Sequence, residues 1–390
     1  MNRDDGLVIV GGGPAGFATA RAYRETGGRS SVTILTTESH APYNRPPLTK
    51  EYLRGEMATE DLALEDDGWY WENGIELRLA TGVTAVDPGR RVVSTESGEK
   101  LAYEACVLAT GSEPVRIPVP GADDPEILVM RTIENSTRLQ ERVGRGDRVV
   151  VVGSGFIGCE AAASLALRGA EVTLISLENS PQRERLGQEV GERIEEWLRD
   201  YGVDLRLGAG LEGIERTDGG YRVSIEGGDT LPTGTVVFGT GVRPRTRLAD
   251  EAGLEVDGGI LTDSSMRTSA SGVFAVGDVA RAYNEAAGRY LKVEHWGDAL
   301  EQGRVAGTAI SGGVAAWSMA PGFWSTIGDR TIKYWAWGDG WDERRFEDRG
   351  DSFTVWYGSE GVLVGVLAHG ADEDYDKGRE LIEQGAPLPG

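Results

Sequence analysis

The chain has 390 residues, 39% of them hydrophobic and 26% charged, and its 63 acidic against 40 basic residues give a net charge of −23. This acidic balance disfavours a nucleic acid partner, because binding to nucleic acid depends on neutralising phosphates with lysine and arginine. No apolar run approaches the roughly 20 residues that a membrane helix needs, so we expect a protein of several domains with no membrane partner.

The cysteine content and the N-terminal segment both favour the cytoplasm. Met1–Asp5 leads directly into an apolar strand without the long apolar run of a secretory signal, so no such signal is expected. Cys106 and Cys159 are the only cysteines and lie far apart in the sequence. Neither a disulfide framework nor a C-x-x-C redox pair is therefore expected.

The first patterned segment is a glycine-rich turn between an apolar strand and a helix. Leu7–Val10 precede Gly11-Gly12-Gly13-Pro14-Ala15-Gly16. In such a turn the first glycine permits the sharp bend, the second lets the backbone approach a pyrophosphate, and the third lets helix and strand pack closely. Glu38 follows the next apolar strand, where a carboxylate can accept hydrogen bonds from an adenosine ribose. The pattern predicts a dinucleotide-binding βαβ unit.

A second unit repeats this plan. Val149–Val152 precede Gly153-Ser154-Gly155-Phe156-Ile157-Gly158, and the unit closes at Val236–Gly241. Its Gly-Thr-Gly ending resembles Ala109-Thr110-Gly111, the end of a buried strand in the first unit. Residues 112–121, rich in proline and glycine, predict a hinge between the two units. Two motifs in the same context predict two dinucleotide sites.

The rest of the chain predicts a strand and a helix that return to the first unit, followed by a tail of different composition. An apolar strand over residues 272–277 ends at Asp278, and a helix is expected from Trp296 to Ile310. Residues 319–390 interleave tryptophans with charges and turn residues, and Ser352–Tyr357 and Val362–Val366 are typical of strands. This tail predicts a small antiparallel sheet.

In this order the motifs resemble those of the FAD-dependent, nicotinamide-linked ferredoxin reductases that serve oxygenases. That group includes the putidaredoxin and rubredoxin reductases, is related to apoptosis-inducing factor, and shares the pyridine nucleotide-disulfide oxidoreductase fold. The resemblance covers nearly the whole chain. Its motifs here are Pro42-Tyr43-Asn44-Arg45-Pro46-Pro47-Leu48-Thr49-Lys50, Met130–Glu134, Val276–Asp278, Val293–Trp296 and Gly322–Ser325.

The resemblance implies an α/β fold with two Rossmann-like dinucleotide-binding domains, for FAD and NAD(P), plus a C-terminal α+β domain with a small antiparallel sheet. It implies an FAD-binding domain at residues 1–113 and 243–318, an NAD(P)-binding domain at 114–242 and a C-terminal domain at 319–390. The implied activity passes a hydride from NADH or NADPH to FAD and then single electrons to a ferredoxin-like partner, the enzyme being a monomer or homodimer.

The resemblance also implies roles for particular residues. Lys50 would lie at the flavin edge and pair with Glu160, which would otherwise be interpreted as a helix-surface carboxylate. Trp324 would lie near the flavin on the electron exit route, as a conduit or as a wall. Arg131 would contact the pyrophosphate and Asp278 a ribityl hydroxyl, although an aspartate at a strand end can also cap a helix.

The motifs and the resemblance together nominate a set of cofactor-binding residues and no metal ligands. In chain order they are Gly11, Gly13, Pro14, Ala15, Gly16, Glu38, Arg45, Pro46, Lys50, Val83, Ala109, Thr110, Gly111, Arg131, Gly153, Gly155, Phe156, Ile157, Gly158, Glu160, Ser176, Arg183, Gly241, Gly277, Asp278, Glu294, His295 and Trp296.

Two departures from the family pattern leave questions open. Ser176 stands where the family usually places a glutamate for the ribose 2'-hydroxyl. Arg183 or Arg185 could reach a 2'-phosphate, whereas Glu178 could still accept the hydroxyl, so the sequence does not choose between NADPH and NADH. Thr326-Ile327 replaces the usual Asp-Gln after Trp324-Ser325, so the acceptor side can differ.

The electron acceptor also remains open. The Tyr43–Lys50 segment contains no cysteine, which disfavours a thiol relay. The net charge of −23 opposes an acidic ferredoxin, unless basic side chains of the tail form a local patch. Alternatives are an NAD(P)H oxidase or diaphorase, a reductase of a small specialised substrate, and a redox-sensing interaction protein resembling apoptosis-inducing factor. The candidate basic residues are Arg330, Lys333, Arg344, Arg345 and Arg349.

Overall fold

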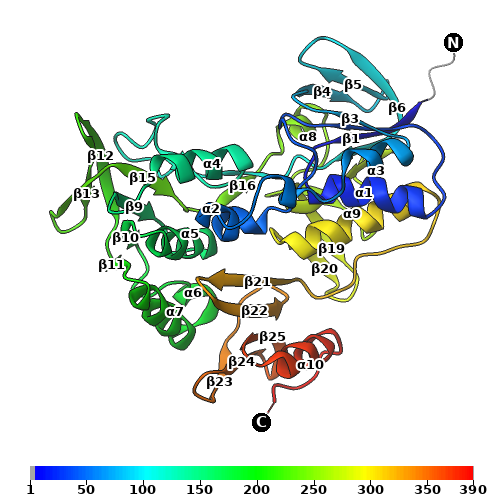
Figure 1. Ribbon diagram of the computed structural model, residues 1–390. Coiled ribbons are helices and arrows are strands. Elements are labelled where there is room, and N and C mark those ends of the chain that lie inside the picture. The colour runs from blue at the N-terminus through cyan, green and yellow to red at the C-terminus, as the bar shows by residue number, and fades with distance from the viewer. Residues whose placement is uncertain (1–4, 390) are drawn as a thin grey trace.

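The structure is a computed structural model that describes residues 5–389. Residues 1–4 and 390 lie outside the described range, and with them most of the Met1–Asp5 segment discussed above. Figure 1 shows three regions: strands and helices from the blue, cyan and yellow parts of the chain, a green region, and an orange and red region at the C-terminal end.

The first region is built on a sheet whose strands come from distant parts of the chain. Its order is β3-β2-β1-β6-β5-β4, and β18 also pairs with β6. All pairs among β3, β2, β1, β6 and β18 are parallel, whereas β4 and β5 form antiparallel pairs. Every residue of β1 and β2 is buried, as in a parallel sheet covered on both faces. The strands are β1 (Gly6–Val10), β2 (Val32–Leu35), β3 (Ile75–Arg78), β4 (Val83–Asp87), β5 (Val92–Thr95), β6 (Lys100–Leu108) and β18 (Val273–Ala275).

Helices α1 (Pro14–Glu25) and α9 (Trp296–Ile310) pack closely on this sheet, although they lie far apart in the chain. Glycines allow the close approach. A Cβ atom added at Gly303 would lie 2.3 Å from the carbonyl oxygen of Ala15, and one at Gly307 would lie 2.4 Å from that of Thr19. The yellow helix of Figure 1 therefore returns to the region that follows the first glycine turn.

The second region repeats the parallel plan. Its sheet has the order β11-β10-β9-β15-β8, and each neighbouring pair of strands is parallel. Helix α5 follows the second glycine turn and is buried along most of its length. The elements are β8 (Leu128–Val129), α4 (Ile133–Arg142), β9 (Arg148–Val152), α5 (Phe156–Leu167), β10 (Glu171–Ser176), α6 (Arg183–Leu186), α7 (Gln188–Asp200), β11 (Asp204–Leu207) and β15 (Thr235–Phe238).

Smaller sheets connect and extend these regions. β7 (Ser112–Pro114) and β16 (Val242–Pro244) pair antiparallel where the chain leaves the first region and where it returns. Two further sheets have the orders β12-β13-β14 and β17-β19-β20. Their strands are β12 (Leu211–Thr217), β13 (Gly220–Ile225), β14 (Thr230–Thr233), β17 (Ile260–Thr262), β19 (Ala280–Asn284) and β20 (Arg289–Lys292).

Short helices fill the connections. Two of them follow one another in the chain, and the first begins at the Pro-Pro pair of the Tyr43–Lys50 segment. They are the 3-10 turns η1 (Pro46–Thr49), η2 (Glu60–Leu62) and η3 (Gly277–Val279) and the helices α2 (Glu51–Arg54), α3 (Asp67–Glu72) and α8 (Arg247–Glu251).

The C-terminal region is an antiparallel sheet covered by one helix. Its order is β21-β22-β25-β24-β23, and the sheet packs against α6 and α7, where the Tyr357 hydroxyl donates to the Leu186 carbonyl at 2.8 Å. Trp197 and Phe353 join the same hydrophobic core from the two sides. The elements are β21 (Gly322–Ile327), β22 (Arg330–Ala336), β23 (Glu343–Asp348), β24 (Phe353–Ser359), β25 (Val362–His369) and α10 (Asp372–Glu383).

The expected fold class is confirmed: two parallel-sheet, Rossmann-like regions and an antiparallel C-terminal sheet. The sequence did not predict the three-stranded sheet of β12–β14 or the pairing of β7 with β16, because both depend on contacts between strands rather than on local pattern. Among residues 5–389, no helix combines the length and the apolar character needed to cross a membrane.

Candidate functional site

One large cavity runs past both glycine turns. Its volume is about 1440 Å³, above the roughly 300–1,000 Å³ of a typical small-molecule site. Gly11–Ala15 line one part and Gly155–Ile157 another, with Lys50 and Phe323 also on the wall. A cavity of this size and extent has room for two nucleotides placed end to end.

The first glycine turn has the geometry that a pyrophosphate site requires. Gly11 adopts φ +126°, and a Cβ atom there would lie 2.0 Å from the Ala109 carbonyl oxygen. A Cβ at Gly16 would lie 2.2 Å from the Gly11 carbonyl oxygen, so this glycine serves helix–strand packing. Gly13 instead borders open space and is the N-cap of α1, which has no side-chain cap. The helix N-terminus is therefore free to interact with an anion.

The second glycine turn repeats these constraints. Gly153 adopts φ +105°, and a Cβ there would lie 2.5 Å from the Gly239 carbonyl oxygen. A Cβ at Gly158 would lie 2.0 Å from the Gly153 carbonyl oxygen. Gly155 is the N-cap of α5, again without a side-chain cap. The two turns thus share one local structure as well as one sequence pattern.

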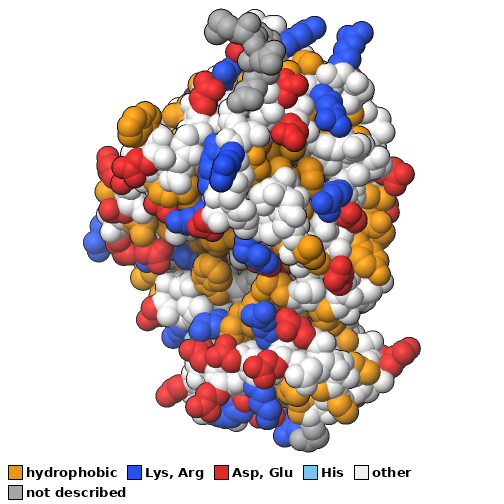
Figure 2. Space-filling view, turned by 90° about the vertical axis from the view of Figure 1, so that its right-hand side faces the viewer, with side chains coloured by type: hydrophobic (Ala, Val, Ile, Leu, Met, Phe, Trp, Pro, Cys, Tyr) orange, Lys and Arg blue, Asp and Glu red, His pale blue; other side chains and the backbone are white. Residues whose placement is uncertain are grey.

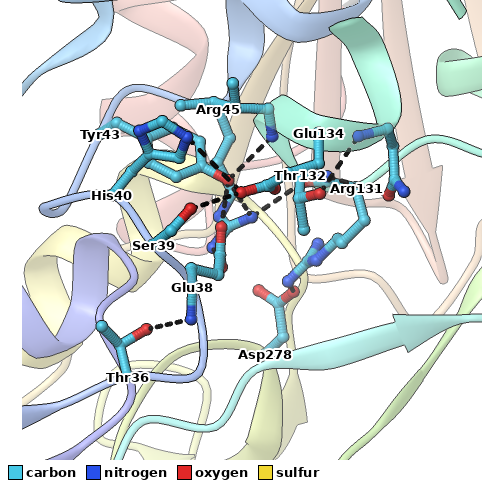
Figure 3. A network of polar contacts seen from close by, with 12 residues as sticks. Thr36, Glu38, Ser39, His40, Tyr43, Arg45, Arg131, Thr132, Glu134 and Asp278 are labelled. Atoms are coloured by element: carbon cyan, nitrogen blue, oxygen red, sulfur yellow. Dashed lines mark hydrogen bonds and ion pairs between the residues drawn. The ribbon is translucent and has the colours of Figure 1, made fainter. Parts of the chain in front are cut away.

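Glu38 lies at the centre of a polar network on the cavity wall (Figure 3). Arg45 Nη2 lies 2.6 Å from Glu38 Oε1, and the Tyr43 hydroxyl donates to Glu38 Oε2 at 2.5 Å. Burial, more than any neighbouring charge, raises the pKa of Tyr43, so its hydroxyl stays protonated as a donor. The network fixes a carboxylate where the first unit is expected to meet an adenosine ribose.

Asp278 is held by an ion pair and a hydroxyl. Arg131 Nη2 lies 2.8 Å from Asp278 Oδ2, and Ser112 Oγ donates to the same oxygen at 2.6 Å. The alternative role as a helix cap is wrong, since the N-cap of η3 is Val276 and no side chain caps it. Asp278 and Arg131 both line the cavity.

A group of arginines faces the same part of the cavity. Arg45, Arg131 and Arg245 all contribute to its wall. Burial lowers the pKa of Arg245, and the neighbouring positive charge of Arg131 adds to the effect. Because guanidinium groups that share a confined space are stabilised by an anion, the donor set suits a pyrophosphate.

Lys50 and Glu160 form a buried ion pair between the two turns. The distance from Lys50 Nζ to Glu160 Oε2 is 2.6 Å, and the two residues are 6% and 5% exposed. Thr49 Oγ1 donates to the same oxygen at 2.5 Å, while Ser325 Oγ donates to Oε1 at 2.7 Å. The expected contact between Lys50 and Glu160 is therefore present, and the surface interpretation of Glu160 is wrong.

Aromatic rings form the wall beside this pair. The rings of Phe323 and Phe156 lie 4.6 Å apart between centroids, and His295 lies 4.8 Å from Phe323. His295 is the N-cap of α9, as the sequence predicted for the start of that helix. Trp324 is 44% exposed and reaches the cavity mouth from β21. The wall combines flat apolar surfaces with one exposed indole.

The loop after β10 contains the residues that bear on nucleotide preference. The Ser176 and Ser154 hydroxyls lie 2.6 Å apart, and neither residue lines the cavity. The Glu178 carboxylate accepts hydrogen bonds from the backbone N–H groups of Gln182 and Glu184, each at 3.1 Å.

The two arginines of α6 differ in their position relative to the cavity. Arg183 is exposed and does not line the cavity. Arg185 does line it, with its guanidinium 5.8 Å and 5.9 Å from the ring centroids of Phe156 and Phe323. Arg185 rather than Arg183 is therefore the arginine that borders the cavity.

Most nominated residues meet at the one cavity. The exceptions are Gly16, Gly153, Gly158, Ser176 and Arg183, which do not line it. Ser112 and Arg245 carry no local sequence signal, and Thr49 and Ser325 stand out in the sequence only as members of longer motifs. Their hydrogen bonds depend on contacts with distant segments, so spacing alone could not reveal them.

The tail does not present its basic residues as a free patch. All five candidates form ion pairs with acidic side chains. Figure 2 shows blue and red side chains interspersed over the lobe at the bottom of that view. The pairs are Arg330–Asp200, Lys333–Asp372, Arg344–Glu189, Arg345–Glu347 and Arg349 with Glu347 and Asp374.

The two cysteines lie away from the cavity. Cys106 is in β6 and Cys159 in α5, both fully buried and neither on the cavity wall. Burial raises the pKa of the Cys106 thiol to about 12, and burial likewise raises the pKa of Cys159. Since the thiolate is the reactive form, neither side chain is placed for a thiol relay.

Comparisons with known proteins agree with this arrangement. Residues 5–303 match the family described as "Pyridine nucleotide-disulphide oxidoreductase". The chain is 32% identical over 328 residues to a rubredoxin-NAD(+) reductase of Pseudomonas putida, covering 84% of this chain and 85% of that protein. It is 31% identical over 398 residues to the putidaredoxin reductase of Pseudomonas putida, covering 100% and 94%. The solved covalent complex of putidaredoxin reductase with putidaredoxin contains a chain that matches with a TM-score of 0.94 and 31% identity, covering 99% and 94%.

Proposed function

Because the chain belongs to the pyridine nucleotide-disulphide oxidoreductase family, we propose that it passes electrons from NADH or NADPH through FAD to a ferredoxin-type iron–sulfur protein of an oxygenase system. Relatives named for rubredoxin and putidaredoxin, matched over most of their length, support this acceptor class. We further propose that the enzyme acts in the cytoplasm.

The proposal rests on one arrangement: the Lys50–Glu160 pair lies in a single cavity between two glycine turns of the same geometry. Dinucleotides bound at the two turns would share this cavity, whose wall also contains Lys50 and Glu160. A buried cation beside a carboxylate can stabilise negative charge arriving at that point without exposing it to water.

The residues present fit FAD in the first part of the cavity. Gly13 and the N-terminus of α1, with Arg45 and Arg131, would hold the pyrophosphate, Glu38 the adenosine ribose and Asp278 the ribityl chain. Bound FAD supplies the ability to accept a hydride and to release electrons singly.

The chain's own residues would orient the reactants and limit water. Phe156 and Phe323 provide flat apolar surfaces beside the pair. Glu160 keeps the Lys50 ammonium in place, and Trp324, 44% exposed, borders the side where an acceptor can approach. Within residues 5–389 neither cysteine lines the cavity, which supports electron exit without a sulfur relay.

The sheets suggest how the domains divide. We assign an FAD-binding domain to residues 1–113 and 243–318, an NAD(P)-binding domain to 114–242 and a C-terminal domain to 319–390. The antiparallel pairing of β7 with β16 supports the two crossings between the first two domains, because it joins the outgoing and returning strands of the chain.

Anaerobic stopped-flow spectroscopy tests the proposal. Purified protein should be yellow, its flavin absorbance should bleach on adding NADH or NADPH, and a ferredoxin should reoxidise it faster than oxygen does. Fast reoxidation by oxygen and slow transfer to ferredoxins would favour an oxidase or diaphorase instead. Slow turnover with every acceptor, with dimerisation on adding NADH, would favour a redox-sensing protein. A colourless preparation would contradict all three.

A further inference from the structure

We propose that Ser325, in the C-terminal region, is a positioning residue that sets the Glu160 carboxylate and, through it, the Lys50 ammonium. This inference rests on the proposed function, because it takes the Lys50–Glu160 pair to serve flavin reduction. It adds that the third region of the chain helps to build the reaction site of the other two.

The two oxygens of the Glu160 carboxylate accept hydrogen bonds from two different segments of the chain. Its Oε2 accepts from Thr49 Oγ1 at 2.5 Å and Lys50 Nζ at 2.6 Å. Its Oε1 accepts from Ser325 Oγ at 2.7 Å and from the Thr326 backbone N–H at 3.3 Å. Donors on both oxygens prevent the carboxylate from turning, and the shorter contact on the β21 side is the serine hydroxyl.

Burial makes this hydroxyl hard to replace. Ser325 is 1% exposed, and its cross-strand neighbour Ile332 is 0% exposed. A buried hydroxyl needs a hydrogen-bond partner, and the partner here is Glu160. Because side chains alternate along a strand, Trp324 turns to the exposed side while Ser325 turns inward. The inward direction of Ser325 is thus fixed by β21 itself.

Loss of the hydroxyl would leave Oε1 with only the longer backbone contact. Lys50 Nζ also donates to the Pro46 carbonyl at 2.9 Å, so the ammonium would remain in the cavity but lose the fixed carboxylate that sets its position. The expected result is a slower reduction step with nucleotide binding largely retained. A hydrogen bond to a charged group is worth enough to change the limiting rate constant about tenfold.

The test is anaerobic reduction of the FAD-loaded enzyme by NADH and NADPH, without an acceptor. Ser325→Ala should lower the limiting rate constant about tenfold, and Ser325→Thr should restore it. Thr331→Ala is the matched control, because it removes the Thr326–Thr331 hydroxyl contact of the same hairpin but none of the side chains that donate to Glu160. If Ser325→Ala fails to retain FAD, Ser325→Cys makes the same comparison with a weaker donor.

Two further measurements separate positioning from general structure. Ser325→Ala should have no additional effect in a Glu160→Gln background, because residues acting through one another are not additive. The midpoint potential of the bound flavin should become more negative in Ser325→Ala and stay unchanged in Thr331→Ala. Full additivity, or an unchanged rate and potential in Ser325→Ala, would overturn the proposal. A wild-type flavin that neither nucleotide reduces would overturn the proposed function instead.

Discussion

Arg131 and Asp278 contact each other directly: Arg131 Nη2 lies 2.8 Å from Asp278 Oδ2. Sequence reasoning nominated these residues for different parts of FAD, the pyrophosphate and the ribityl chain. Their contact brings the two parts of the site to one point on the cavity wall, where Ser112 adds a hydroxyl donor. The ion pair can therefore hold both side chains in place while Arg131 binds the pyrophosphate and Asp278 the ribityl chain.

Asp278→Asn should weaken FAD retention. The change removes the negative charge that holds Arg131 and leaves only a neutral amide oxygen as the acceptor for the Ser112 hydroxyl. A hydrogen bond to a charged group contributes about 1.5–3 kcal/mol, so we expect a dissociation constant about 10- to 100-fold higher. Fluorescence titration of the apoprotein with FAD measures it. Asp257→Asn, which breaks the exposed ion pair with Arg281, is the control, and equal FAD affinity in both variants would contradict the assigned role.

Lys50→Met should slow flavin reduction and also destabilise the fold. It leaves the Glu160 carboxylate buried without its cation, which costs about 3–5 kcal/mol. The double variant Lys50→Met/Glu160→Gln should regain most of the stability but not the reduction rate, because the ammonium is still missing. Denaturant unfolding and stopped-flow reduction measure the two effects. Recovery of the rate in the double variant would show that Lys50 matters only for stability.

Glu178→Gln should shift nucleotide preference toward NADPH. The Glu178 carboxylate is fixed by two backbone N–H groups beside Ser176, where a negative charge repels a 2'-phosphate and can accept from a 2'-hydroxyl. We expect the ratio of the NADP⁺ to the NAD⁺ dissociation constant to fall about tenfold. Calorimetric titration measures both. Glu212→Gln, an exposed acid of β12 that does not line the cavity, is the control, and an equal shift there would point to general charge rather than to Glu178.

The sequence predicted the elements but not the contacts that join them. The glycine turns, the helix from Trp296 to Ile310 and the strand before Asp278 follow from local pattern, because periodicity and turn chemistry are local properties. The pairing of Lys50 with Glu160 came from family resemblance and could not come from spacing across 110 residues. Ser325 carried no signal beyond its place in a motif, since its role depends on a third region folding against the first two.

The sequence also did not predict which acidic side chains pair with the basic residues of the tail. The tail's basic residues suggested a docking patch. In the fold each meets an acid, and two of those acids come from distant segments, Asp200 for Arg330 and Glu189 for Arg344. Net charge is readable from sequence, but the local field is a property of the folded surface.

The Cys106 thiol should resist labelling until the protein unfolds. Burial raises its pKa to about 12, so the reactive thiolate is scarce at pH 8 in the folded protein. Because the pKa is higher in the folded state, the associated stability is complete below the ordinary thiol pKa of about 8.5 and declines as the pH rises from there toward 12. Thiol-reagent kinetics at pH 8 and unfolding free energies from pH 7 to 11 measure both effects. Rapid labelling of the native protein would contradict the prediction and reopen a thiol role.

Gly303→Ala should destabilise the protein, because helices α1 and α9 meet at this glycine. The added Cβ would lie 2.3 Å from the Ala15 carbonyl oxygen, a backbone atom that cannot move without displacing α1. Overpacking of this kind costs about 1–3 kcal/mol. The displacement of α1 should also weaken FAD binding, because Ala15 belongs to the first glycine turn and lines the cavity.

Gly297→Ala, in the same helix but with open space around its Cβ, is the control and should instead increase the stability by up to about 1 kcal/mol through helix propensity. Denaturant unfolding of the two variants measures this opposition, and equal stabilities would show that α1 and α9 are not in such close contact.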